Sequence, residues 1–318
     1  MSTRYGVRFS TLARCPDHSR LTFSFDTSHP DHDTDMAYTL QDLETRLNDP
    51  LLLDSGAPLP SEAQHIFEHA LALLERGEIR AATRDADGTW HAVPWVKRAI
   101  LLGFRIGRVV EMSGGGPFQF FDKHTFPARS FRLENCIRIV PGGSTVRRGA
   151  YLANNVVCMP PMYVNVGAYV GRGTMIDSHA LVGSCAQIGE RVHLSAAAQI
   201  GGVLEPINAS PVVIEDDVVV GGNCGVYEGT VVRARAVLGA GVILTRGTPV
   251  YDLVRETVHR ATADKPLEIP EGAVVVPGAR RVSSAFGEAE GLSLQTPVIV
   301  KYRDDRTDAA TALEAWLR

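Results

Sequence analysis

An apolar residue recurs at every sixth position through much of the second half of this chain. Ten such positions follow one another without a break and seven more continue after one interruption: Val146, Leu152, Cys158, Val164, Val170, Ile176, Val182, Ile188, Leu194 and Ile200, then Ile214, Val220, Val226, Val232, Leu238, Leu244 and Val250. An α-helix repeats every 3.6 residues and a β-strand every two, so neither produces this spacing. A coil with three short faces does, because each face directs one apolar side chain toward the coil axis. The spacing therefore predicts a parallel β-helix with roughly 18 residues per turn and about five to six turns.

Small residues and glycines accompany this repeat. The residue two positions before the apolar one is mostly small, as at Ala168 and Ala180, and a glycine often follows directly, as at Gly171 and Gly183. We expect the small side chain to fill the narrow interior and the glycine to let the chain turn the corner.

Ile214 follows Ile200 by 14 positions, which is two more than two six-residue steps. This interruption contains the sequence GGVLEPINASP (201–211). Gly, Pro, Asn and Ser punctuate this stretch, so we expect a loop that leaves the coil. Loops that project from a rigid scaffold are a common place for binding residues.

Helical patterns precede the repeat. The stretch 60–80 has apolar residues at helical spacing, with Ser61 as its expected N-cap and Gly77 as its end. A turn is expected at Asp87-Gly88 and a second helix over 94–103. These elements predict a small α/β domain ahead of the β-helix.

The chain is therefore predicted to be mainly β and to have four parts: a divergent N-terminal segment (1–50), an α/β domain (51–136), the β-helix (137–255) and a C-terminal cap (256–318). In the first part, HPDHDTD has the residue types of a metal site, although a solvated loop is the more ordinary interpretation. In the cap, the strands GAVVV and PVIVKY and a terminal helix TDAATALEAWLR are expected to cover the open end of the coil.

Composition excludes several classes of function. The 318 residues carry a net charge of −4 and no long basic run, so no nucleic-acid partner is expected. No apolar stretch is long enough to span a membrane or to form a signal core, so we expect no membrane partner and a cytoplasmic location. Cys158, Cys185 and Cys224 fall inside the repeat and the chain has no CxxC pair, which predicts buried thiols and no metal site.

The repeat also contains specific strings. These are NVGAYV, GTMID, GSCAQIG and IGGVLEP, with CIRIVPGGSTVRRGAYLANN before them and GAVVVPG after them. In these strings, and in the helical stretch LLERGEIRAATRDADGTWHAVPWVKRAILLGFRI, the chain resembles the tetrahydrodipicolinate N-succinyltransferases of bacterial lysine biosynthesis. The likeness covers residues 60–303, most of the chain.

The resemblance implies a left-handed coil and a homotrimer that binds acyl-CoA in grooves between neighbouring β-helices. It implies transfer of a succinyl group from succinyl-CoA to the amino group of opened tetrahydrodipicolinate, a 2-amino-6-oxo dicarboxylate. The acyl-CoA is a co-substrate, and no permanently bound cofactor is implied.

Two residues match the family's substrate contacts, Arg138 in CIRIVP and Asp177 in GTMID. A guanidinium can hold a carboxylate through two parallel hydrogen bonds, which suits Arg138 to a dicarboxylate substrate. A carboxylate can hold an ammonium group and accept its proton, which suits Asp177 to the reacting amine because only the neutral amine attacks a thioester. Ser195 and Glu205 are further candidates for substrate binding.

Backbone N–H groups are the expected contacts to acyl-CoA. The glycines predicted to provide them are Gly201, Gly202 and Gly239, and those near Gly201 are also candidates for stabilising the tetrahedral oxyanion. His193 and His179 are alternative bases, although packing at a corner is the commoner role for such residues.

The chain departs from the family at three places. GGNCGVYEG (221–229) stands where the succinyltransferases have a segment like GARSEVVEG, so Gly225 replaces their second acidic residue and Glu228 becomes the candidate for that catalytic role. This string also resembles the related N-acetyltransferases. Ala196 and Ala197 replace glycines, and His179 stands where the family often has tryptophan. The added methyl groups leave less room for a longer acyl chain.

Alternative functions remain open on the sequence. Acetyl-CoA is the competing donor, and a tabtoxin-like specialised pathway is a variant of the same chemistry. A catalytically silent β-helix paralogue is a third alternative, suggested by the missing glutamate. A zinc carbonic anhydrase needs three histidine ligands, whereas the repeat contains only His179 and His193.

Overall fold

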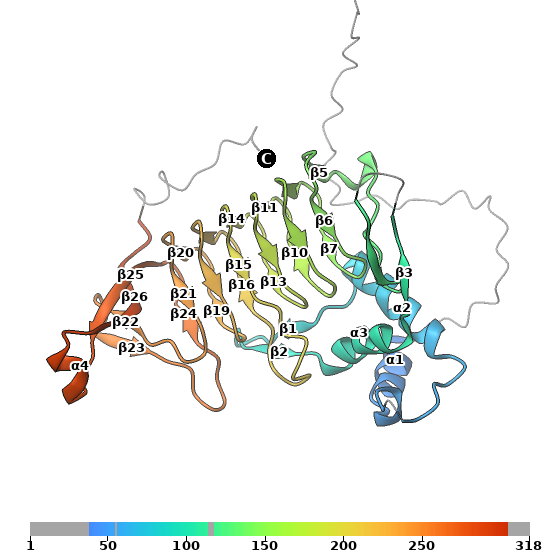
Figure 1. Ribbon diagram of the computed structural model, residues 1–318, viewed down its shortest axis with the longest axis horizontal. Helices are drawn as coiled ribbons and strands as arrows, with labels where there is room; N and C mark the ends of the chain where they lie inside the picture. The colour runs from blue at the N-terminus through green and yellow to red at the C-terminus, as the bar shows by residue number, and fades with distance from the viewer. Residues whose placement is uncertain (1–37, 55, 114–117, 305–318) are drawn as a thin grey trace, which may run out of the picture. The chain divides into compact units, whose positions relative to one another are not determined.

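Successive two-residue strands wind into a left-handed parallel β-helix, which confirms the fold class expected from the sequence (Figure 1). The computed structural model describes residues 38–54, 56–113 and 118–304. Strands one turn apart pair in parallel: β11 (Met175–Ile176) pairs with β14 (His193–Leu194), and Ile176 lies opposite Leu194.

The strands stack into three faces, named A, B and C below. Face A contains, in order, β7 (Tyr151–Leu152), β10 (Tyr169–Val170), β13 (Gln187–Ile188), β16 (Val213–Ile214), β19 (Val231–Val232) and β24 (Glu268–Ile269). Face B contains β5 (Arg138–Ile139), β8 (Val157–Cys158), β11, β14, β17 (Val219–Val220) and β20 (Val237–Leu238), followed by β25 (Ala273–Arg281), β26 (Ser293–Tyr302), β22 (Val250–Asp252) and β23 (Thr257–His259). Face C contains β6 (Thr145–Val146), β9 (Tyr163–Val164), β12 (Leu181–Val182), β15 (Gln199–Ile200), β18 (Gly225–Val226) and β21 (Ile243–Leu244).

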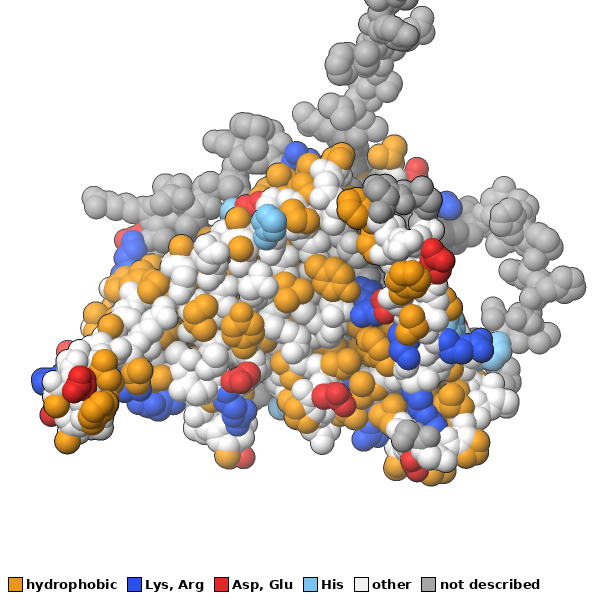
Figure 2. Space-filling model, viewed as in Figure 1, with side chains coloured by type: hydrophobic (Ala, Val, Ile, Leu, Met, Phe, Trp, Pro, Cys, Tyr) orange, Lys and Arg blue, Asp and Glu red, His pale blue; other side chains and the backbone are white. Residues whose placement is uncertain are grey.

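The interior of the coil is apolar, as the six-residue spacing predicted. All seventeen positions of the repeat are buried, and none is more than 5% exposed. Their removal from water, at about 25 cal/mol per Å² of apolar surface, is the main force that holds successive turns together. In Figure 2, the side of the coil in view is mostly apolar or uncharged, and charged side chains gather toward its edges and the two ends.

The interruption forms the expected loop, but its length differs from the sequence count. The strand that contains Ile200 lies on face C, and the next strand, which contains Ile214, lies on face A. The chain therefore advances by one face, which normally takes six residues, but it uses fourteen, so the loop holds eight extra residues (14 − 6 = 8). The expected division into two steps and two extra residues is therefore wrong. The buried Lys97 donates a hydrogen bond from Nζ to the Ala209 carbonyl and so fixes the loop to the N-terminal domain.

The coil also continues past the end of the sequence spacing. Val250 fits the spacing, but β22 pairs with β26 and β23 rather than with a strand one turn earlier. The strands that extend faces A and B are β24 and β25, and their Ile269 and Val275 are buried in the same core. The polar stretch before β24 concealed this last step in the sequence.

The corners depend on backbone conformation at one repeated position, three residues after the buried apolar residue. Residues there have positive φ, for example His179 (φ 62°) and Ala197 (φ 59°). Glycines directly after the apolar residue do not turn the corner, so that expectation is wrong. At Gly183 the reason is close approach, because a β-carbon there would lie 2.2 Å from the backbone N of Gly202 on the next turn.

The described part of the N-terminal domain contains three α-helices and two short hairpins. Its elements are α1 (Leu40–Leu47), η1 (Pro50–Leu52), α2 (Ala63–Arg76), β1 (Ala82–Arg84), β2 (Trp90–Ala92), α3 (Pro94–Ile106), β3 (Val109–Glu111), β4 (Phe121–Lys123) and η2 (Leu133–Asn135). The expected helices and the Gly77 end of α2 are confirmed, since Gly77 has φ 72°. The Ser61 cap is wrong, because α2 begins at Ala63 and its N-cap residue makes no side-chain hydrogen bond.

This domain packs on the first turns of the coil. Phe67, Ile100 and Phe126 form its core, which includes Val166 and Cys185 from the corner between faces C and A. Helix α1 was not expected. It begins at a capping box in which Thr39 and Asp42 exchange hydrogen bonds.

The cap is built on the antiparallel pair β25 and β26, joined through α4 (Ala285–Ala289). Asp252 is buried beneath it and accepts a 2.6 Å hydrogen bond from the Tyr302 hydroxyl. The predicted terminal helix and the HPDHDTD segment lie outside the described residues. In the described ranges, no helix is long and apolar enough to cross a membrane. The same ranges contain no group of three His, Cys, Asp or Glu side chains that could hold a metal ion.

Candidate active site

Asp177 lies at the corner between faces B and C, directly after β11. Its Oδ1 accepts a 2.7 Å hydrogen bond from the Ser178 N–H, which fixes the carboxylate at this corner. The His193 Nε2 lies 3.8 Å from Asp177 Oδ2, because β14 places His193 beside Met175 on the next turn. The distance exceeds a hydrogen bond, so the contact is electrostatic when the imidazole is protonated.

Arg138 lies on face B, the face whose strand β11 ends just before Asp177. It is exposed on β5, which pairs with β8, and β8 in turn pairs with β11. Two strand spacings separate Arg138 from the strand that leads to Asp177, which corresponds to roughly 10 Å. The strand that carries Arg138 and the strand that precedes Asp177 therefore lie two strand spacings apart on one side of the coil.

Ser195 completes this group. It follows β14 as Asp177 follows β11, and the Asp177 N–H bonds to the Leu194 carbonyl at 2.9 Å. Ser195 thus lies about one strand spacing from Asp177, roughly 4.8 Å along the coil. The structure brings Arg138, Asp177 and Ser195 together on one side of the coil, with His193 beside them.

The two predicted glutamates lie elsewhere. Glu228 is exposed at the corner between faces C and A, where its Oε2 accepts a 2.8 Å hydrogen bond from the Arg246 N–H. Glu205 is exposed in the loop of residues 201–211, which leaves the coil at the same corner. Within one chain, neither glutamate is brought to Asp177. His179 is exposed at the Asp177 corner, in the left-handed conformation that turns it.

The predicted glycines differ in what their N–H groups can do. Those of Gly201 and Gly239 donate to the Val226 and Val275 carbonyls at 2.8 and 2.7 Å, so they hold the coil together. In the described part of the chain, the Gly202 N–H has no such acceptor. Of these three glycines, only Gly202 has an N–H that remains available to an oxyanion or an acyl-CoA oxygen.

The cysteines of the repeat are buried. Burial raises the pKa of Cys158 and of Cys185 to about 12 and also raises the pKa of Cys224. The reactive form of cysteine is the thiolate, which burial disfavours at these positions. Direct attack of an amine on a thioester remains the chemistry that suits the site.

Two family models match this chain. One describes the tetrahydrodipicolinate N-succinyltransferase N-terminal region and matches residues 52–106, and the other describes the hexapeptide repeat of succinyl-transferase and matches residues 211–246. A 2,3,4,5-tetrahydropyridine-2,6-dicarboxylate N-succinyltransferase of Nitrobacter hamburgensis is 43% identical over 273 residues, which cover 82% of this chain and 92% of that protein. The chain belongs to the tetrahydrodipicolinate N-succinyltransferase family.

Other members of this succinyltransferase family agree. Proteins with the same name from Rhodopseudomonas palustris and Afipia carboxidovorans are each 42% identical to this chain. The alignments cover 83% and 88% of this chain and 92% and 99% of the two relatives. The similarity therefore includes both the N-terminal domain and the β-helix, and the protein is a CoA-dependent acyltransferase.

Tyr227 is a residue of this family member that the sequence reasoning missed. A β-carbon on Gly225 would lie 2.4 Å from its Cε2 atom, and one on Gly201 would lie 2.7 Å from its Cδ1 atom. The ring therefore covers the outward side of Gly225 on face C. The available signal was the occurrence of glycines on two neighbouring turns, at Gly201 and Gly225, with an aromatic residue nearby in the sequence.

Proposed function

We propose that this protein transfers a succinyl group from succinyl-CoA to the amino group of opened tetrahydrodipicolinate, a step toward diaminopimelate and lysine. Relatives more than 40% identical along most of the chain are named for this reaction. The structural observation that supports it is that Arg138 lies on a strand of face B and that Asp177 directly follows another strand of this face, two strand spacings away. One end of this surface suits a carboxylate and the other suits an amine.

The proposed reaction begins with the substrate ammonium held by Asp177. Asp177 accepts one proton, and the neutral amine attacks the thioester carbonyl to form a carbon–nitrogen bond. Collapse of the tetrahedral intermediate breaks the carbon–sulfur bond. The nitrogen then loses its second proton, one proton protonates the CoA thiolate, and the other is released to solvent. His193, 3.8 Å from Asp177, is placed to relay the proton that Asp177 accepts.

The homotrimer implied by the family belongs to the same proposal. The outward residues of face C are uncharged from Thr145 to Ile243, which suits contact with a neighbouring coil. Glu205 and Glu228 lie at a corner away from Asp177, so they reach an amine at Asp177 only from an adjacent chain. We propose that the acceptor and acyl-CoA lie between chains and that the enzyme works in the cytoplasm.

Acetyl-CoA is the second candidate donor, and the Tyr227 ring is the observation that favours it. The ring fills space on face C over Gly201 and Gly225. A bulky ring near the acyl chain discriminates against the longer and charged succinyl group.

Release of CoA thiol, followed with the purified enzyme and tetrahydrodipicolinate, tests both donors. Succinyl-CoA is expected to give the larger kcat/KM. A larger value with acetyl-CoA would reverse the choice of donor, and no thiol release with either would remove the proposed function.

A further inference from the structure

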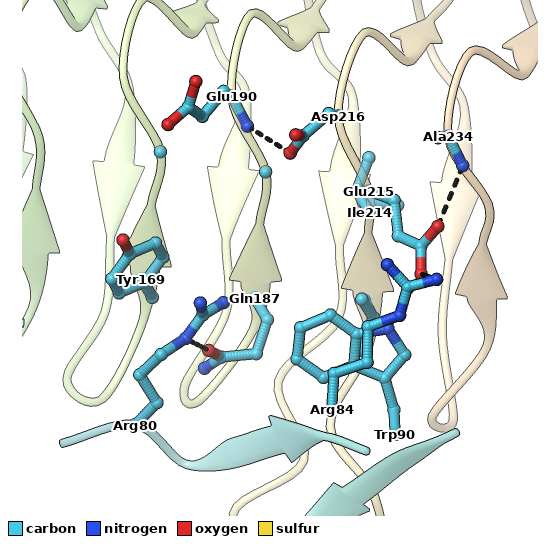
Figure 3. A pocket seen from close by; sticks show the side chains of 13 residues that line it. Arg80, Arg84, Trp90, Tyr169, Gln187, Glu190, Ile214, Glu215, Asp216 and Ala234 are labelled. Atoms are coloured by element: carbon cyan, nitrogen blue, oxygen red, sulfur yellow. Dashed lines mark hydrogen bonds and ion pairs between the residues drawn. The ribbon is translucent and has the colours of Figure 1, made fainter. Parts of the chain in front are cut away.

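A cavity of about 340 Å³ lies between the hairpin β1–β2 and face A of the coil (Figure 3). Arg80, Arg84 and Trp90 line it from the hairpin side, and Tyr169, Gln187 and Asp216 are among the residues that line it from the coil. Asp177 lies at the corner between faces B and C, and none of the residues predicted for acyl transfer lines the cavity. The cavity therefore needs an explanation separate from the proposed reaction.

Arg80 is the unusual group in this cavity. Its Cζ lies 3.7 Å from the centre of the Tyr169 ring and 5.5 Å from that of Trp90. Its Nε donates a 2.8 Å hydrogen bond to Gln187 Oε1, and this is the guanidinium's only hydrogen bond to the described residues. Burial lowers the pKa of Arg80, which reflects the cost of removing this cation from water. Arg80 is partly buried, and the charge of Asp216 offsets part of this effect on its pKa. A partly buried cation of this kind is stabilised further by an anion that contacts it directly.

The nearest buried carboxylate does not fill that role. Glu215 accepts hydrogen bonds from Trp90 Nε1 at 2.9 Å, Arg233 Nη1 at 3.0 Å and the Ala234 N–H at 3.0 Å. Arg84 lies 3.5 Å from the same carboxylate. The oxygens of Glu215 are thus already occupied by these three donors. The terminal nitrogens of Arg80 are directed into the cavity (Figure 3).

The opposite wall of the cavity is acidic. Glu190 and Asp216 lie on neighbouring turns, and Asp216 Oδ1 accepts a 2.8 Å hydrogen bond from the Glu190 N–H. Their side chains are half exposed, and Arg191 lies 2.7 Å from Glu190 and 3.9 Å from Asp216 while it is also bonded to Asp217. Arg191 is thus shared among three carboxylates, so this wall attracts a cation and repels a second anionic group.

We propose that this cavity binds a free basic amino acid. Its carboxylate pairs with the terminal nitrogens of Arg80, its aliphatic chain lies along Trp90, and its side-chain ammonium group faces Asp216 and Glu190. A dicarboxylate ligand would place its second charge against the acidic wall, and a diamine would leave Arg80 without an anion. The ligand therefore carries one carboxylate and an excess of positive charge. This inference does not depend on the proposed function, because the residues involved are separate.

Isothermal titration of the full-length protein with L-lysine tests the site, with L-glutamate and 1,5-diaminopentane as comparison ligands. L-Lysine is expected to bind at least about 10-fold more tightly than either, since each comparison ligand lacks one charge-assisted contact or adds a repulsive one. Equal binding of L-glutamate, or no binding of L-lysine at about 10 mM, would overturn the proposal.

The variant Arg80→Gln is expected to weaken L-lysine binding by about 10-fold to 100-fold. Arg281→Gln, which removes the same charge from an exposed position on β25, is the matched control and should bind normally. A thermal unfolding scan checks that Arg80→Gln remains folded. Wild-type affinity in a folded Arg80→Gln protein would remove Arg80 from the site.

Asp216→Asn provides a second variant at the other wall. The asparagine oxygen can still accept the Glu190 N–H, so the corner is preserved while the charge is lost. L-Lysine binding is expected to weaken by about 10-fold. Asp177→Asn should bind L-lysine as the wild type does. A loss of binding in that variant would instead place the amino acid at the acyl-transfer site.

Discussion

The ring of Tyr227 covers the Cα atom of Gly225, so closely that a β-carbon there would lie 2.4 Å from Cε2. Gly225 begins strand β18, and Tyr227 directly follows this strand. The ring of Tyr227 also covers Gly201 on the previous turn. An aromatic side chain therefore covers this part of face C, and a side chain on either glycine beneath it would collide with the ring.

Gly225→Ala is expected to lower the free energy of unfolding by about 1–3 kcal/mol, because the added methyl group forces the Tyr227 ring to move. In a Tyr227→Ala background, the same substitution should cost less than about 1 kcal/mol. Urea unfolding of the wild type, both single variants and the double variant measures this coupling. Gly247→Ala is the control, since the atom nearest to its added β-carbon is 4.0 Å away. Additive effects of the two substitutions would show that the ring does not restrict Gly225.

Tyr227→Ala is also expected to raise the ratio of kcat/KM for succinyl-CoA to that for acetyl-CoA, by about 10-fold. The reason is steric, because one or two carbon groups in a confined site change transition-state binding by about 1–3 kcal/mol. Tyr227→Phe keeps the ring and should leave the ratio near its wild-type value. Equal ratios in all three proteins would show that the acyl chain does not reach this ring.

Asp177→Asn is expected to lower turnover by at least about 100-fold, the usual scale for the loss of a general base. Asparagine keeps an oxygen that can accept the Ser178 N–H, so the corner should stay intact. Asp264→Asn, at an exposed position in the loop before β24, is the control and should retain wild-type turnover. Unchanged turnover in Asp177→Asn would transfer the role of base to another group, with His193 the neighbouring candidate.

Arg138→Ala is expected to raise the KM for the amino acid acceptor by about 10-fold to 100-fold, with a smaller change in kcat. Arg138→Lys should restore part of the affinity, because a lysine keeps the charge but cannot bind a carboxylate through two parallel hydrogen bonds. The KM for acyl-CoA provides the internal control and should not change. A normal acceptor KM in Arg138→Ala would exclude the carboxylate role.

The six-residue spacing was enough to predict the β-helix, because one inward apolar residue per face leaves little freedom in how the chain can coil. It could not locate the end of the coil, since β24 and β25 return only after a polar stretch of sequence, although their Ile269 and Val275 pair with Val232 and Leu238 one turn earlier. Close approach between turns is also hidden from a single sequence. Gly183 is constrained by the backbone of Gly202, and that contact exists only after the coil has formed.

The candidate site was predictable to a similar extent. Arg138 and Asp177 were found through strings that resemble a family, and the parallel pairing of β5, β8 and β11 then places Arg138 and the strand that precedes Asp177 on one face. Tyr227 was missed because its effect depends on glycines from two turns. Arg80 was missed because it precedes the hairpin, more than a hundred residues from Gln187, its hydrogen-bond partner.

Arg191 and Asp217 predict how stability depends on pH. Arg191 Nε and Nη2 donate hydrogen bonds of 2.8 and 2.9 Å to the two oxygens of Asp217 on the next turn, and these bonds hold the pKa of Asp217 below its usual value of 3.8. Because the folded pKa is depressed, the contribution of Asp217 to stability is complete above pH 3.8 and is lost as the pH falls through the lower folded value.

Asp217→Asn should therefore reduce the free energy of unfolding at pH 7, by no more than about 1 kcal/mol because the pair is partly exposed to solvent. The difference from the wild type should shrink as the pH is lowered from 4 to 2, since the wild-type carboxylate becomes protonated and loses the same attraction. Urea unfolding across this range measures both quantities, with Asp264→Asn as an exposed control that should show a smaller difference at pH 7. A difference that stays constant down to pH 2 would mean that the Asp217 charge does not contribute to holding the two turns together.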